Sequence, residues 1–203
     1  MNKVKFVLFM AGISLALAFA FGCSSGDNDE IGYDDSFEIN PQVYNGDDGS
    51  PYTGNGVISM EVPYSYGGIL ENIGSIKSGI INLELPTTIS DDYLLNPSDF
   101  QEFSECTYSK DFKFLSGYFV LTNGYQRFEL DIGYWDEQIR ETIGYSYYSK
   151  AGKITCSGVT IDVKKGWNKG YKRCIRSGED EICELSTNNI LKNEVRWRLW
   201  KIG

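Results

Sequence analysis

The residue types best able to do chemistry in this chain lie in the stretch DIGYWDEQ, residues 131–138. Asp131, Asp136 and Glu137 stand close to Tyr134 and Trp135. Two carboxyl groups about 5 to 9.5 Å apart, one of them with a raised pKa, can hydrolyse a glycosidic bond. Acids beside an aromatic are also common on any acidic surface. We therefore interpret these residues as solvated surface and keep a carboxylate-based glycoside hydrolase as the alternative.

Histidine is absent from the sequence. The chain by itself therefore cannot form a Ser-His-Asp triad, a Cys-His pair or a histidine-ligated metal site. The loop NGDDGS, residues 45–50, lacks the spacing and the bidentate acid of an EF-hand. We expect a protein that is not an enzyme and that holds no metal and no cofactor.

A cluster of lysines interrupts the acidic sequence at VTIDVKKGWNKGYK, residues 159–172, around Trp167 and Asn168. An exposed Trp167 could stack on a sugar ring, whereas a buried one would form a corner of the core after a turn at Gly166. The pattern favours the buried position. If an exposed aromatic contacts a glycan or a protein partner, the candidates are Trp167, Asn168, Trp135 and Tyr134.

The amino-terminal segment predicts export. Lys3 and Lys5 precede an apolar run over residues 6–21, which ends at Gly22 and Cys23. This is the layout of a signal peptide, and the run is shorter than the ~20 residues that span a bilayer. The block resembles a bacterial lipoprotein signal, which implies a signal peptide over residues 1–22 and lipidation of Cys23. The alternative is ordinary cleavage near Ala20 or Gly22, which would leave Cys23 as a free thiol.

Residues 23–40 are acidic and offer little to bury, so we expect a flexible tether there. The stretch resembles those that send some Gram-negative lipoproteins to the cell exterior. Ser24 also replaces the aspartate that retains such proteins in the inner membrane. We expect anchoring to the outer membrane through the lipid, on the cell surface or on the periplasmic face. The net charge of −9 argues against a nucleic-acid partner.

The rest of the chain, residues 41–203, predicts one antiparallel β-sandwich of about eight to ten strands with one or two short helices. Asn123-Gly124 predicts a type I′ hairpin turn that places Phe119 opposite Phe128 and Leu115 opposite Ile132. A second hairpin turns about Ser78-Gly79 within residues 73–86. Further strands are expected over residues 56–62, 143–149, 153–163, 170–175, 182–185 and 194–200, and helical turns over 97–103 and 136–142.

Four cysteines follow Cys23, and an even number in an exported chain predicts two disulfides. A two-residue turn at Gly178-Glu179 would place Cys174 opposite Cys183 at a close strand pair. Cys106–Cys156 then follows by elimination. Zinc binding is the rival interpretation, but the chain has no CxxC spacing and no histidine.

The order YTGNG, GSIKSGIINLELP, VTIDVKKGWN and VRWRLW resembles small paralogous lipoproteins of Gram-negative anaerobic bacteria. The resemblance covers most of residues 50–200. It consists of strand and turn residues, so it implies a β fold and an envelope location without pointing to catalytic residues. Together these observations predict a lipid-anchored, non-catalytic binding module.

Overall fold

The computed structural model describes residues 39–62, 68–100, 103–156, 159–177 and 180–202. The expected signal peptide, Cys23 and all of the tether except its last two residues lie outside this described part. No helix within the described ranges is long and apolar enough to cross a membrane.

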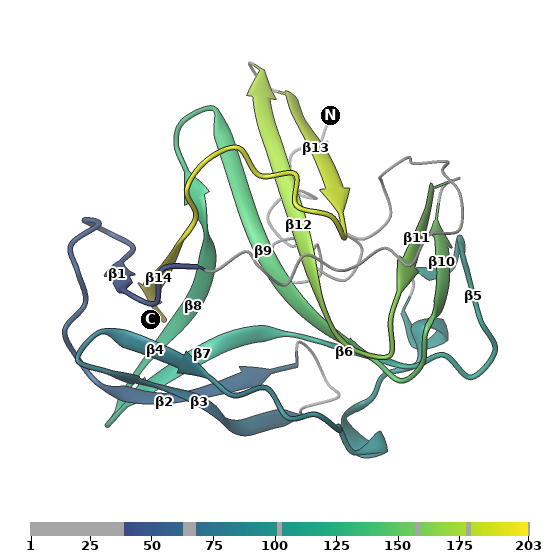
Figure 1. Cartoon of the computed structure of the whole chain (residues 1–203), viewed down its shortest axis with the longest axis horizontal. Coiled ribbons are helices and arrows are strands. Elements are labelled where there is room, and N and C mark those ends of the chain that lie inside the picture. The colour runs from purple at the N-terminus through teal and green to yellow at the C-terminus, as the bar shows by residue number, and fades with distance from the viewer. Residues whose placement is uncertain (1–38, 63–67, 101–102, 157–158, 178–179, 203) are drawn as a thin grey trace, which may run out of the picture.

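The described chain folds as a mainly β, largely antiparallel sandwich, as the sequence predicts (Figure 1). The two helical elements that lie wholly within the described residues are short 3-10 turns, η1 (Asp91–Tyr93) and η2 (Pro97–Asp99). The strands are β1 (Val43–Asn45), β2 (Gly56–Glu61), β3 (Ile69–Lys77), β4 (Ile80–Leu83), β5 (Cys106–Tyr108), β6 (Phe114–Ser116), β7 (Tyr118–Asn123), β8 (Gln126–Trp135), β9 (Ile139–Tyr148), β10 (Gly152–Cys156), β11 (Val159–Val163), β12 (Gly166–Ser177), β13 (Asp180–Ser186) and β14 (Arg196–Lys201). The described part thus holds fourteen strands, because two expected strands are each divided and the short β1 and β5 are added.

The main sheet has the order β13-β12-β9-β8-β7-β2-β3-β4, with β14 on β8, β6 on β9, and β1 parallel to β14. Strand β4, at the far edge of this order, meets the segment just before β1, because Gln42 bridges Ile80 and the Ile81 N–H donates to the Pro41 carbonyl at 2.9 Å. Strands β1, β14, β8, β7, β2, β3 and β4 therefore form a closed circuit of neighbours. Figure 1 shows β9, β12 and β13 rising as a second layer above β2, β3, β4 and β7.

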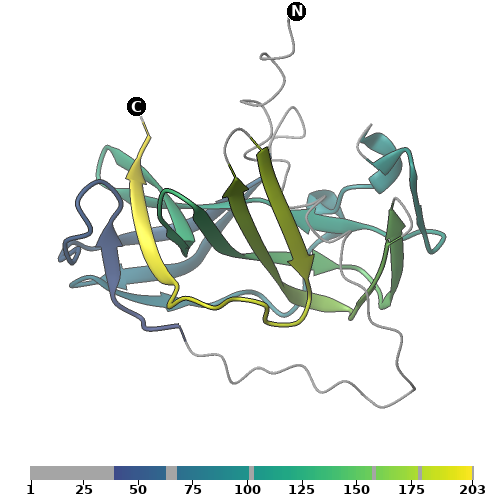
Figure 2. The ribbon, with the colours of Figure 1, turned by 90° about the horizontal axis from the view of Figure 1, so that it is seen from above.

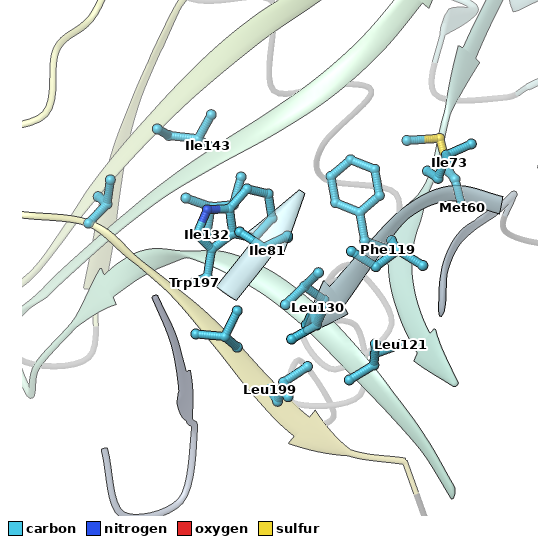
Figure 3. Packing of buried hydrophobic residues seen from close by; sticks show 14 of the residues in the cluster. Met60, Ile73, Ile81, Phe119, Leu121, Leu130, Ile132, Ile143, Trp197 and Leu199 are labelled. Carbon is cyan, nitrogen blue, oxygen red and sulfur yellow. The ribbon is translucent and has the colours of Figure 1, made fainter. Parts of the chain in front are cut away.

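The main core fills the space between these layers. Phe119 of β7 lies 5.8 Å from the Tyr145 ring of β9 and 6.3 Å from the Trp197 ring of β14, measured between centroids. Figure 3 shows Trp197, Phe119 and neighbouring aliphatic side chains converging from several strands. Trp197 and Leu199 of β14, with Val195 just before the strand, are buried in this core, and Arg196 and Arg198 lie on the other face.

The hairpin β7–β8 forms, but its predicted register is wrong by two residues. The turn residues are Gly124 and Tyr125, so Leu121 rather than Phe119 lies opposite Phe128. Gly124 has a φ of 59° at the first central position, which is typical of a type II′ turn. An even shift keeps every side chain on its predicted face.

The predicted pairing of Leu115 with Ile132 is also wrong. Leu115 lies in β6 and pairs with Tyr147 of β9. The strand is divided at Gly117, which packs so tightly on the Glu61 carbonyl that a Cβ atom would collide with it. β8 therefore pairs with β7 but not with β6, and β9 lies beside β6 instead.

The second hairpin is confirmed. Ser78 and Gly79 have φ values of 49° and 78°, the two positive angles of a type I′ turn, and Ile76 lies opposite Ile81. A Cβ atom on Gly79 would collide with the Tyr52 carbonyl, so glycine is required there.

The two helical predictions have different outcomes. Residues 97–99 form η2 within the expected range, but Asn96 makes no side-chain cap. The helical turn expected over residues 136–142 is wrong, because Asp136 lies in the β8–β9 turn and β9 begins at Ile139. The Asp136 carboxylate accepts the N–H groups of Gln138 and Ile139, which favours this turn over a helix.

Both predicted disulfides are present. Cys174 of β12 pairs with Cys183 of β13, with Cα atoms 4.0 Å apart, in the predicted register. Their sulfurs lie within 4.8 Å of a Glu181 oxygen, but they are bonded to each other, so this group offers no thiolate for zinc. The turn at residues 178–179 lies outside the described part.

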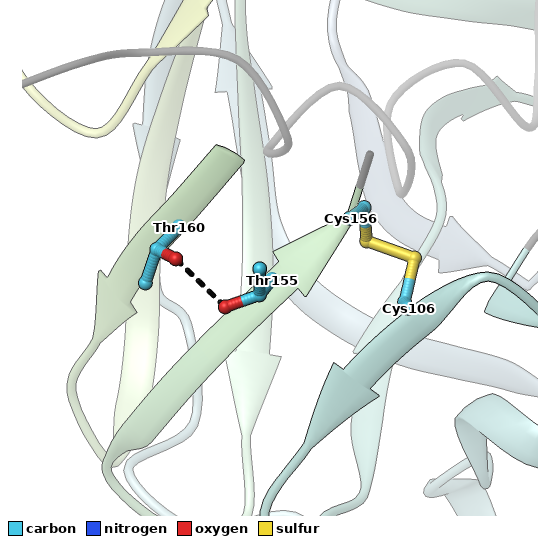
Figure 4. The surroundings of a disulfide bond; sticks show 4 residues. All are labelled: Cys106, Thr155, Cys156 and Thr160. Atoms are coloured by element: carbon cyan, nitrogen blue, oxygen red, sulfur yellow. Dashed lines mark hydrogen bonds between the residues drawn. A yellow bond between two sulfur atoms is a disulfide. The ribbon is translucent and has the colours of Figure 1, made fainter. Parts of the chain in front are cut away.

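The other disulfide, Cys106–Cys156, joins β5 to β10 in a separate sheet of order β11-β10-β5 (Figure 4). Beside it the hydroxyls of Thr155 and Thr160 share a 2.7 Å hydrogen bond between β10 and β11. This sheet covers a second, aromatic-rich core that includes Phe103, Phe112 and Phe114. Figures 1 and 2 place it at the opposite end of the molecule from β1 and β14.

Candidate binding face on strands β1, β8 and β14

The structure separates the carboxylates that the sequence suggested for hydrolysis. Asp131 and Asp136 lie five residues apart on the extended strand β8 and its end, about 16 Å at their Cα atoms. The Asp136 pKa is lowered by N–H donation from Ile139 and Gln138 and by the Tyr134 hydroxyl. Glu137 is exposed. Asp136 therefore suits a structural turn cap rather than a proton donor.

The carboxylate that influences Asp131 belongs to Glu129, a residue that the sequence did not point to. Burial and the nearby Glu129 carboxylate raise the pKa of Asp131 to about 6, while Arg140 acts in the opposite direction. Residues two apart on a strand share a face and lie about 7 Å apart. Glu129 and Asp131 are therefore the closest counterpart in the described chain to the expected carboxylate pair.

Trp167 is half-buried and packs against the main core, which is closer to the buried position that its sequence favours than to a free surface position. Its indole N–H donates to the Pro86 carbonyl at 2.8 Å, and its ring meets that of Tyr147 edge-on at 5.6 Å. Asn168 is 1% exposed. Its side chain bonds the N–H and carbonyl of Lys164 and the carbonyl of Gly166, which closes the β11–β12 turn. Both side chains make contacts that hold the fold together, which favours a structural role for them.

Tyr134 and Trp135 point to opposite faces of β8, because successive side chains on a strand alternate. Tyr134 packs against the main core and donates its hydroxyl to Asp136 at 2.9 Å. Trp135 lies on the outer face, where its ring meets Trp200 edge-on at 6.1 Å and the Arg198 guanidinium lies 5.2 Å from its centroid.

These contacts belong to a larger set that we call the outer-face cluster. Strand pairing builds it, since Arg198 lies opposite Asp131 on one side and opposite Tyr44 on the other. The Arg196 guanidinium lies 5.1 Å from the Tyr44 ring centroid and pairs with Glu194 at 3.4 Å. The cluster consists of Tyr44, Trp135, Arg196, Arg198 and Trp200.

Two glycines make room for the indoles of this cluster. A Cβ atom on Gly133 would collide with the Trp135 ring, and one on Gly46 would collide with the Trp200 ring. Each indole therefore lies against bare backbone, which fixes its position on the sheet.

Comparisons with protein-family models, curated proteins and solved structures return no match. The function must therefore be argued from this geometry.

Sequence reasoning found Trp135 but missed Trp200, Arg198 and Tyr44. The alternation of VRWRLW does place Arg196, Arg198 and Trp200 on one outward face, so that signal was present in the sequence. What the sequence could not supply was the pairing of β14 with both β8 and β1, which brings residues far apart in the chain together.

Proposed function

We propose that this chain is a non-catalytic, lipid-anchored binding protein that contacts a glycan through the outer-face cluster. The observation that carries the proposal is the gathering of two indoles, a phenol and two guanidinium groups on one face of β1, β8 and β14. Aromatic rings stack on the apolar faces of sugars, and each guanidinium offers five N–H donors in a fixed plane. Trp, Tyr and Arg are also the residues that dominate binding energy in protein interfaces. A protein partner is therefore the alternative.

The proposed location follows from the sequence and is compatible with the fold. Two disulfides suit an oxidising, extracytoplasmic compartment. An acidic tether after Cys23 would hold the domain in water, away from the membrane to which the lipid anchors it.

We expect Trp135→Ala and Trp200→Ala each to weaken retention on a glycan array by about tenfold or more, because each removes a stacking surface. Tyr125→Ala is the matched control, since Tyr125 is a fully exposed aromatic at the tip of the β7–β8 hairpin. Thermal melts of all three variants separate lost contact from lost folding. Binding to a protein array that the same two variants abolish, with no glycan retained, would identify the partner as a protein.

The hydrolase alternative has one favourable observation, the raised pKa of Asp131 beside Glu129. We expect purified protein to leave polysaccharides intact. Cleavage that Asp131→Asn or Glu129→Gln abolishes without loss of folding would overturn the non-catalytic proposal. Asp136→Asn and Glu137→Gln test the pair that the sequence first suggested.

Lipid anchoring can be tested directly. Growth with labelled palmitate should mark the protein, and Cys23→Ala should remove the label, because the thiol is the expected acylation site. Mass spectrometry of the mature amino terminus is the second measurement. A terminus at any residue other than Cys23 would contradict the anchor.

A further inference from the structure

A cavity of about 330 Å³ lies where β9 faces the closed circuit of strands. Its walls come from Pro41 before β1, from Ile81, Leu83 and Leu85 in and after β4, from Tyr145 of β9 and from Trp197 of β14. The cavity is distinct from the outer-face cluster, since Trp197 points inward between the outward-facing Arg196 and Arg198. A ligand here would therefore be a second one, independent of the proposed glycan.

Tyr145 and Trp197 are the two polar side chains that line the cavity, and neither has a hydrogen-bond partner among the described residues. Within the described residues, neither the Trp197 indole N–H nor the Tyr145 hydroxyl makes a hydrogen bond, although Trp197 is only 4% exposed. No fully buried side-chain nitrogen or oxygen in that part of the chain lacks a partner. Both groups must therefore reach open space, and the cavity is the space that they line.

The side chains that line the cavity carry no charge. Burial raises the pKa of Tyr145 to about 12, with Tyr171 adding to the shift, so the hydroxyl keeps its proton and can donate. The other lining side chains are apolar, apart from the indole N–H, and none of them is charged. A carboxylate entering the cavity would lose its hydration without gaining a cation, which is costly.

We propose that the cavity binds a neutral apolar molecule that carries one hydrogen-bond acceptor, such as the carbonyl oxygen of an ester. Apolar walls would hold the hydrocarbon part of such a molecule. The Tyr145 hydroxyl or the Trp197 N–H would donate to the carbonyl, since a buried acceptor needs a donor. The volume equals about eleven water-sized groups of about 30 Å³ each, which matches methyl octanoate in size.

Ligand-observed NMR titrations of methyl octanoate and of octanoate at pH 8 test the class of ligand. We expect the ester to bind at least about tenfold more tightly than the anion, which has the same chain but a charged head. Absence of ester binding, or equal binding of both compounds, would overturn the proposal.

Variants test the place of binding. Leu83→Phe should fill the cavity and abolish ester binding, whereas Val57→Phe, at an exposed position of β2, should leave it unchanged. Tyr145→Phe and Trp197→Phe each remove one donor, and at least one of them should weaken ester binding about two- to tenfold. Circular dichroism checks folding, and if Leu83→Phe does not fold the two donor variants decide the outcome. Unchanged ester affinity in both of them would overturn the proposal.

Discussion

Glu141→Gln should lower the free energy of unfolding by about 3–5 kcal/mol, the cost of breaking a buried ion pair by removing one partner. Glu141 is 0% exposed on the inner face of β9. Its carboxylate accepts the Arg173 Nε–H at 2.9 Å and the N–H of Asn193 at 2.9 Å, and it also accepts the Lys192 N–H. Glutamine would leave Arg173 without its counter-charge and would turn an amide donor toward groups that themselves donate.

Urea denaturation measures this effect as a shift in the midpoint at constant slope. Glu71→Gln is the control, because Glu71 is exposed on β3. Combining Glu141→Gln with Arg173→Met should cost less than the two single changes added together, since the double variant leaves no unpaired buried charge. A loss for Glu141→Gln within about 1 kcal/mol of the control would contradict the ion-pair argument.

The position of Glu141 links stability to the proposed binding face. Lys192 and Asn193 lie in the connection from β13 to β14, so the carboxylate fastens that connection to the sheet. β14 carries three members of the outer-face cluster, Arg196, Arg198 and Trp200. Loss of the Glu141 contacts should therefore loosen the strand that holds the cluster.

The sequence predicts which face a side chain occupies more reliably than it predicts register. The predicted pairs put Phe119, Leu115 and Ile132 on one face of the sheet, and all three lie in the main core. Alternation could not distinguish registers that differ by two residues, because both bury the same set. The preference of Asn-Gly for hairpin turns therefore predicted the turn at Asn123-Gly124, one residue before its actual position at Gly124-Tyr125. For the hairpin about Ser78-Gly79, the local turn residues were sufficient.

Features that depend on distant parts of the chain could not be predicted. Glu141 lies in the polar stretch QIRET and resembles any surface acid until Arg173 and the β13–β14 connection close over it. The bridge from Gln42 to Ile80 and the meeting of Trp135 with Trp200 likewise arise from pairings between remote segments. The cysteines are the exception, since turn geometry and elimination sufficed for both bonds.

Those two bonds should differ in what they contribute to stability. The chain-entropy estimate increases with the number of residues between the bonded cysteines. Cys106 and Cys156 are 50 residues apart, whereas Cys174 and Cys183 are 9 apart. Replacing the first pair with alanines should therefore cost about 4 kcal/mol, against about 2.7 kcal/mol for the second pair.

The strands that become less stable when each disulfide is removed should differ as well. Cys106–Cys156 fastens β5 to β10 over the second core, so its removal should expose amides of β5, β10 and β11 to hydrogen exchange before those of the main sheet. Removing Cys174–Cys183 should instead release β13, which already pairs with β12 along its length. Denaturant midpoints give the order of the two losses, and exchange gives their location. An equal or reversed order would show that strain or residual structure in the unfolded chain, rather than loop length, sets the contribution of these bonds.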